Sequence, residues 1–181
     1  MTVRHSHAAS LDAATRYVAN GWPILPGTVH PDAVRPWLPH SVPLRTVEQV
    51  RRWWVGGTSS VWLFPGPLFS LLSVEPALAR ELFESPEFQR HPGPVLHEQG
   101  RDAQVVFVVS PVPERFEFPP SLRSSVRLVP SWDSVPAPPT IKGGYEVYWW
   151  YHPDRVGWQP APFGPVLAAV TAVRSTWRAV T

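Results

Sequence analysis

The apolar residues of this chain recur every three or four positions in four segments, which is the spacing of one face of a helix. In the first segment Ser10 is placed to cap the helix, and Asn20 followed by glycine ends it. The second follows Thr46, another capping residue, and ends at a pair of glycines. The pattern predicts helices over residues 10–20, 47–55, 76–83 and 165–177.

Shorter apolar runs, bounded by proline and glycine, predict strands. Residues 61–64 and 69–74 are separated by a short segment that contains Pro-Gly-Pro, so we expect them to pair with each other. Residues 105–109 are all β-branched or aromatic and are expected at the centre of the sheet. Prolines recur from 111 to 139, which favours edge strands and irregular loops there. Further strands are predicted at 22–26 and 145–151.

This order of elements predicts an α+β fold in which a mixed β-sheet carries flanking helices. The 181 residues suit one domain, and we expect residues 1–9 to be flexible. The 24 prolines and 11 glycines predict many turns and few long helices. Domain organisation is therefore expected to be a single unit over 1–181.

The amino-acid composition excludes several kinds of functional site. The absence of cysteine excludes disulfides, thiolate metal sites and a cysteine nucleophile. No apolar run approaches the roughly 20 residues that cross a bilayer, and the first residues lack the apolar core of a signal peptide, so we expect a cytoplasmic protein without membrane association. Sixteen basic residues against 14 acidic ones leave a net charge of only +2, which is small for a protein that neutralises many phosphates.

Common catalytic motifs are missing. The sequence contains no G-x-S-x-G elbow, no phosphate-binding G-x-x-x-x-G-K and no G-x-G-x-x-G. His91, His97 and Glu98 do not have the spacing of a helical zinc site. Glu81 and Glu84 are better explained as a solvated helix face than as a glycosidase pair.

Several short segments follow one another in an order that belongs to a known family. An alanine-rich helix with a tyrosine leads into a Gly-Trp-x-hydrophobic-x-Pro strand, and a helix ending in two tryptophans comes next. Later a Gly-Arg turn precedes the strongest strand, and an Ala-Pro-Pro-Thr segment precedes a glycine turn and an aromatic strand. The segments are 13–17, 21–26, 46–54, 100–109, 135–140 and 143–150. In this order they resemble the N-terminal domain of bifunctional DNA primase–polymerases, the prim-pol family.

The resemblance implies a polymerase site in which an Asp-x-Asp strand and a third acid hold divalent metal. At the matching positions this chain has Ser73 and Glu75, and Arg127 stands in place of the third acid. The family's histidine corresponds to Gln104, close to Arg101 of the Gly-Arg turn. We therefore predict remnants of a metal site and of a nucleotide site, with no catalytic residue, metal or cofactor.

The function of such an inactive domain is left open between three hypotheses. The aromatic run 145–151 alternates, so Tyr148 and Trp150 are expected on the face opposite Tyr145, Val147, Trp149 and Tyr151. Tyr148 and Trp150, with Lys142 and Arg155, form a possible binding face. That face could dock a partner protein or a second copy, which we favour, or bind single-stranded nucleic acid or a nucleotide. The aromatic residues could also be core, and the remodelled cleft could carry an unrecognised activity.

Overall fold

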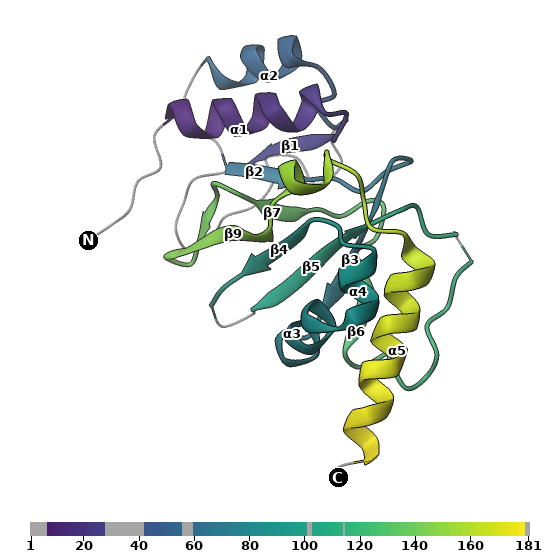
Figure 1. The fold of residues 1–181 in the computed structure, drawn as a ribbon. Helices are drawn as coiled ribbons and strands as arrows, with labels where there is room; N and C mark the ends of the chain where they lie inside the picture. Colours follow the sequence, from purple (N-terminus) through teal and green to yellow (C-terminus); the bar gives the residue numbers. More distant parts are fainter. Residues whose placement is uncertain (1–6, 28–41, 56–59, 101–102, 114, 180–181) are drawn as a thin grey trace.

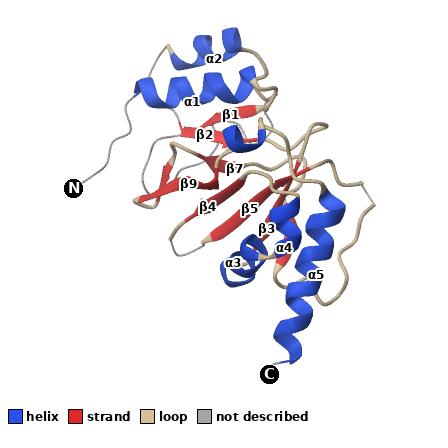
Figure 2. Ribbon diagram, viewed as in Figure 1, coloured by secondary structure: helices blue, strands red, loops and turns tan. Residues whose placement is uncertain are grey.

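The structure is a computed structural model that describes residues 7–27, 42–55, 60–100, 103–113 and 115–179. Its class is α+β, as predicted, and in the described part of the chain the strands form two sheets (Figures 1 and 2). The smaller sheet has the order β1-β2-β7, with β1 (Ile24–Gly27), β2 (Ser60–Leu63) and β7 (Val135–Ala137). The larger has the order β6-β3-β5-β4-β9-β8, with β6 (Val126–Leu128), β3 (Ser70–Val74), β5 (Gln104–Val109), β4 (Val95–Glu98), β9 (Tyr145–Tyr151) and β8 (Ile141–Lys142).

The prediction of a mixed sheet is wrong, because every pair of neighbouring strands in the described sheets is antiparallel. A parallel pair needs a crossover of a dozen or more residues. The connection between β4 and β5 spans only residues 99–103, which is far too short. The expected central position of 105–109 is confirmed, since β5 is flanked by β3 and β4.

The predicted pairing of 61–64 with 69–74 is also wrong. These segments are the successive strands β2 and β3, but each enters a different sheet. Both edges of β2 are occupied, by β1 and β7, and both edges of β3 by β5 and β6. The Pro-Gly-Pro connection therefore carries the chain from one sheet to the other.

Helices cover both sheets (Figure 1). α1 (His7–Ala19) and α2 (Val47–Trp54) lie over the small sheet, whereas α3 (Pro76–Glu84), α4 (Pro86–Arg90) and α5 (Phe163–Ala179) lie against the far face of the large one. A short 3-10 helix, η1 (Pro153–Val156), follows β9. Thr46 caps α2 as predicted, in a capping box with Gln49. None of the helices in the described ranges has the length and apolar character that crossing a membrane requires.

The first helix starts earlier than its sequence indicated. α1 begins at His7, so residues 7–9 are helical and the predicted start at Ser10 is wrong. The expected flexibility of residues 1–9 stays a prediction. Ser10 is not the cap but a buried residue inside the helix, 7% exposed. A small side chain fits there because this face of α1 packs with Ala14, Tyr17 and Val18 toward the core.

The large sheet separates two apolar cores. One lies between it and the small sheet with α1 and α2, and includes Trp22, Trp54, Phe69 and Leu96. The other lies under α3, α4 and α5, and includes Phe88 and Phe107. Side chains alternate along β3, β4 and β5, so neighbours on one strand enter different cores. On the face that lines the first core, polar residues follow the apolar ones at one end of these strands. The alternation therefore brings those polar side chains together.

A bulge in β9 overturns one part of the predicted alternation. Leu96 is opposite Trp149 and Val95 is opposite Tyr151, so one extra residue, Trp150, is accommodated between them. Tyr151 consequently packs with Trp150 in the core under the helices, instead of sharing the face of Trp149. The sequence pattern gives no sign of this shift.

Candidate functional site

A polar cluster is centred on the side-chain amide of Gln104, at the start of β5. Its Oε1 accepts hydrogen bonds from Ser73 Oγ at 2.8 Å and from Arg127 Nη2 at 3.0 Å. Its Nε2 donates to Glu98 Oε2 at 2.8 Å. One neutral side chain thus joins residues of the four strands β3, β4, β5 and β6.

Glu98 is the most deeply buried charged group of this cluster, with only 1% of the residue exposed. A buried carboxylate needs a partner, because removing it from water costs several kcal/mol. Glu98 Oε1 forms an ion pair with Nζ of Lys142, on β8. Glu98 is thus held by one cation and one amide. We name the set Ser73, Glu98, Gln104, Arg127 and Lys142 the Gln104 cluster.

Strand register explains why these residues meet. Ser73 is directly opposite Arg127 across the β3–β6 pair, and Glu98 is directly opposite Gln104 across the β4–β5 pair. Side chains directly opposite in antiparallel strands lie about 4.5–5.5 Å apart at Cβ and point to the same face. That face is turned toward the small sheet. Leu71, Leu96 and Val106 lie on the same face, further along these strands.

A cavity of about 290 Å³ opens beside the Gln104 cluster. Polar side chains on its walls include Ser73, Glu75, Gln104, Arg123, Ser125 and Arg127. Arg123 is held in place by a bond from its Nε to the carbonyl oxygen of Phe118 at 3.0 Å and by an ion pair with Glu117 at 3.0 Å. Two arginines, a glutamate and three serines therefore border one hollow at the end of the large sheet.

The structure brings together most of the residues that the sequence singled out as remnants. Ser73 and Arg127 are each hydrogen-bonded to Gln104. Glu75, which is the residue that precedes α3, lines the same cavity. Arg101 lies outside the described residues. The role of these residues as remnants of a polymerase site stays a prediction.

Sequence reasoning missed the importance of Glu98, which was considered only as a metal ligand beside histidines. A usable signal was present: Glu98 and Gln104 flank a short turn between two strands at a separation that makes them opposite in an antiparallel hairpin. Lys142, in contrast, was assigned to a binding face and instead belongs to the Gln104 cluster.

The proposed binding face of Tyr148, Trp150, Lys142 and Arg155 is not formed as one surface. Tyr148 Oη lies 2.6 Å from His97 Nδ1 and accepts from Trp150 Nε1 at 3.1 Å. Trp150 also contacts Phe83 of α3 with ring centroids 5.8 Å apart. Arg155 lies over the ring of Tyr151 at 5.6 Å. Lys142 is bound to Glu98 on the other side of the sheet. The aromatic pair is therefore partly covered by the chain's own side chains.

The Gln104 cluster does not suit the divalent metal that the resemblance implies. Magnesium is bound by carboxylates and other hard oxygen ligands. Here Ser73 Oγ donates to an amide, and a guanidinium lies across the strand pair from it, where its charge repels a cation. In the described part of the chain, no three histidine, aspartate or glutamate side chains gather into a group that could hold a metal ion.

Comparison of the chain with protein-family models, with curated proteins and with solved structures finds no match.

Proposed function

We propose that this chain is an inactive prim-pol-like domain whose cavity beside the Gln104 cluster binds the phosphate of a nucleotide or of single-stranded nucleic acid without chemistry. One observation carries the proposal: Arg127 lies at the cavity wall and is hydrogen-bonded there to Gln104. A guanidinium held in position is suited to phosphate, because its fork of donors is pre-organised.

The surroundings of Arg127 support an anion more than a cation. Arg123 lines the same cavity, and the hydroxyl of Ser125 adds a neutral donor, whereas that of Ser73 already donates to Gln104. Glu75 offsets part of this positive charge, and the charge of Lys142 is used by Glu98. Two guanidinium groups, Arg123 and Arg127, therefore border the cavity, with Glu75 and Glu117 offsetting part of their charge, which suits one or two phosphates rather than a long backbone.

Docking of a partner protein is less well supported than the sequence indicated. That hypothesis depended on a free aromatic face on β9, but Tyr148 and Trp150 pack against His97 and Phe83. Hot spots at protein interfaces are aromatic side chains that the partner desolvates. Aromatic side chains that contacts within the chain already cover have less surface for a partner protein to bury, so a phosphate ligand is the better-supported proposal.

Calorimetric titration with ATP and with a short oligothymidylate, in EDTA and at two salt concentrations, tests the proposal. We expect Arg127→Gln to weaken binding about tenfold or more, because a hydrogen bond to a charged group contributes about 1.5–3 kcal/mol. Glutamine can still bond to Gln104, so the cluster should stay folded. The matched control is Arg90→Gln on α4, an exposed arginine far from the cavity, which should bind like the parent.

The salt dependence separates the proposal from general attraction to nucleic acid. Two phosphate contacts to a single strand predict a slope of log K against log salt of about −1.4. A slope several times steeper that Arg127→Gln leaves unchanged would show that other basic residues bind the strand. Equal affinities of the parent and of Arg127→Gln for both probes would refute the proposed site.

Primer-extension assays with magnesium or manganese should show no nucleotide incorporation. The reason is that Ser73, Gln104 and Arg127 stand where metal ligands and the phosphate-binding histidine are needed, and are bonded to one another. Gel analysis of a labelled primer with all four nucleotides measures this. Metal-dependent incorporation that Glu75→Ala abolishes would contradict the assignment of an inactive site.

A further inference from the structure

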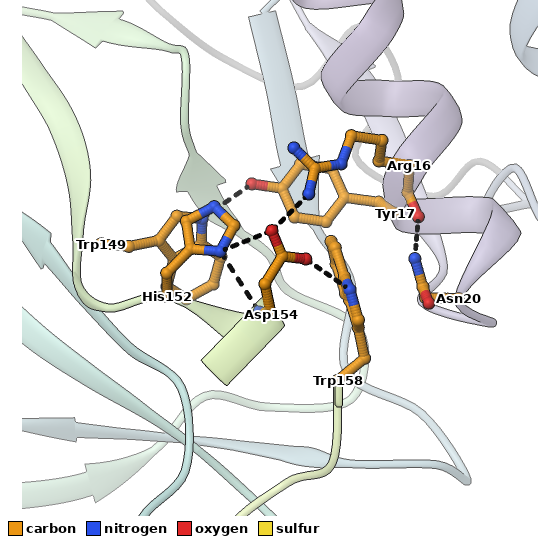
Figure 3. Close-up of polar contacts among 7 residues, drawn as sticks. All are labelled: Arg16, Tyr17, Asn20, Trp149, His152, Asp154 and Trp158. Carbon is orange, nitrogen blue, oxygen red and sulfur yellow. Dashed lines mark hydrogen bonds and ion pairs between the residues drawn. The ribbon is translucent and has the colours of Figure 1, made fainter. Parts of the chain in front are cut away.

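A second cavity, of about 210 Å³, lies between α1 and the turn that follows β9. Of the residues that line it, Figure 3 draws Arg16, Tyr17, Trp149, His152 and Trp158. Its walls include Tyr17, Pro138, Pro139, Trp149, His152 and Trp158, and Asp12 and Arg16 are at its rim. None of these residues borders the cavity beside the Gln104 cluster.

The aromatic walls of this cavity are fixed by hydrogen bonds. Tyr17, only 3% exposed, donates its hydroxyl to the carbonyl oxygen of Pro138 at 2.9 Å and accepts from Trp149 Nε1 at 3.2 Å. Burial raises the pKa of Tyr17, so its phenol stays neutral. Trp158 Nε1 donates to Asp154 Oδ1 at 2.9 Å, and Arg16 pairs with the same carboxylate at 2.5 Å (Figure 3). The walls are therefore largely pre-formed, as ligand sites usually are.

Trp158 is held in an unfavourable backbone conformation. Its φ is +63°, a region that costs a residue with a side chain about 1–2 kcal/mol and is rare for bulky residues. The conformation is fixed by bonds from Trp158 N to the carbonyl oxygen of Pro153 at 2.9 Å and from Trp22 Nε1 to the carbonyl oxygen of Trp158 at 3.2 Å. Strain that surrounding bonds maintain points to a functional position, and here it places an indole at the cavity.

The volume of the cavity and its free hydrogen-bond donors limit which ligand it can take. The cavity is smaller than the roughly 300 Å³ at which sites for drug-sized ligands begin, so it suits a single ring system. Both indole N–H groups are already used, which leaves no tryptophan donor for the carbonyls of a proline-rich peptide. Arg16, whose guanidinium lies 5.9 Å from the centre of the Trp158 ring, occupies the position that a cationic ligand would take.

His152 supplies a donor. Its Nδ1 accepts a hydrogen bond from the backbone N–H of Asp154 at 3.2 Å and lies 3.3 Å from Asp154 Oδ2. We assign the proton of the neutral ring to Nε2, because Nδ1 accepts the backbone hydrogen bond. Burial lowers the pKa of His152, which keeps this neutral form dominant at pH 7. In Figure 3 Nε2 lies on the side of Tyr17, away from Asp154. The cavity therefore combines flat aromatic walls with one N–H donor at its border.

We infer that this aromatic cavity is a second ligand site, which takes one planar heteroaromatic ring with a hydrogen-bond acceptor, of the nucleobase type. The ring packs against the aromatic walls, outside the face of Trp158 that Arg16 covers, and its acceptor receives the Nε2–H of His152. Such stacking tolerates different bases because each has a π-face. The site does not depend on the phosphate-binding function proposed above, since it shares no residue with that cavity.

Titration of the full chain, labelled with nitrogen-15 at tryptophan, with adenosine and with thymidine tests the inference by NMR. We expect the indole N–H signals of Trp149 and Trp158 to shift and saturate, and the signal of Trp132, exposed and absent from both cavities, to stay unchanged. Signals are assigned by single Trp→Phe variants.

Two variants are expected to weaken the binding of adenosine at the aromatic cavity. Trp158→Gly removes one wall at a position whose φ suits glycine, and His152→Asn removes the imidazole while its side chain can still accept from Asp154 N. Each should weaken adenosine binding about fivefold or more. His91→Asn, an exposed histidine after α4, is the matched control and should bind like the parent. Thermal unfolding checks that each variant is folded.

The source of the ring follows from comparing adenosine with an oligodeoxyadenylate. Tighter binding of the oligomer that both variants weaken identifies a nucleic-acid strand, and equal binding identifies a free nucleoside; both outcomes support the site. Absence of any saturable shift of Trp149 and Trp158 with either nucleoside and with the oligomer overturns the inference. Binding of tetramethylammonium in place of the nucleosides also overturns it, because that would make the cavity a cation site.

Discussion

Replacing Lys142 with methionine should lower the free energy of unfolding by about 2–4 kcal/mol, although Lys142 is itself partly exposed. The loss arises at Glu98, whose side chain is 2% exposed and would keep a buried charge with only the amide of Gln104 as partner. Removing one member of a buried ion pair typically costs about 3–5 kcal/mol, and the remaining hydrogen bond and the exposure of Lys142 reduce that figure. Urea denaturation followed by circular dichroism measures the change.

Two further variants isolate this cause. In Lys142→Met combined with Glu98→Gln, the buried charge is gone, so most of the lost stability should return. Arg52→Met removes a cation of the same kind from an exposed pair with Glu48, at 2.5 Å, and should change stability by less than about 0.5 kcal/mol. A double variant as unstable as Lys142→Met would show that packing of the lysine stem, and not charge, holds β8 in place.

Gly93→Ala should destabilise the chain by about 3 kcal/mol or more, for a steric reason. A Cβ at residue 93 would lie 2.4 Å from the backbone nitrogen of Ala161 and 2.8 Å from its Cα. Ala161 cannot shift freely, because its N–H donates to Val108 O at 2.9 Å and its carbonyl oxygen accepts from Ser110 N at 2.7 Å. Forcing atoms into a packed region typically costs about 1–3 kcal/mol, and a backbone obstacle places this case at the upper end.

Gly164→Ala is the matched control. A Cβ at Gly164 in the first turn of α5 meets no atom within 4 Å, so the same substitution should leave stability unchanged or raise it by up to about 1 kcal/mol. Thermal and urea unfolding of both variants gives the comparison. A small effect of Gly93→Ala would mean that the segment before α5 moves away from β4 without loss.

The sequence predicted which segments form helices and strands better than it predicted how the strands pair. The strand at 105–109 was placed centrally because a run of β-branched residues needs burial on both faces, and both cores do contact it. The pairing of β2 with β3 was wrong because proximity in sequence favours a hairpin, whereas the outcome depends on distant strands β7 and β5. Such competition is not visible in local patterns.

For a comparable reason, only part of the candidate site could be predicted from the sequence. Ser73, Gln104 and Arg127 were singled out from their positions in motifs, and those motifs lie on strands whose register brings them together. Glu98 and the aromatic cavity were missed because both depend on long-range contacts: Lys142 reaches Glu98 across 44 positions, and Tyr17 reaches Trp149 across 132. The face on which docking was predicted is partly covered, because Tyr148 contacts His97 and Trp150 contacts Phe83.

The arrangement of the small sheet constrains the order in which the chain can fold. Its middle strand β2 contacts β1 about 40 positions earlier and β7 about 75 positions later. Closing loops of that length delays pairing, since the entropy is lost before the contacts form. During synthesis from the N-terminus, β2 would wait with one open edge until residues 135–137 have left the ribosome. Until then β2 exposes apolar side chains and an unpaired strand edge, which is a site for association with other chains.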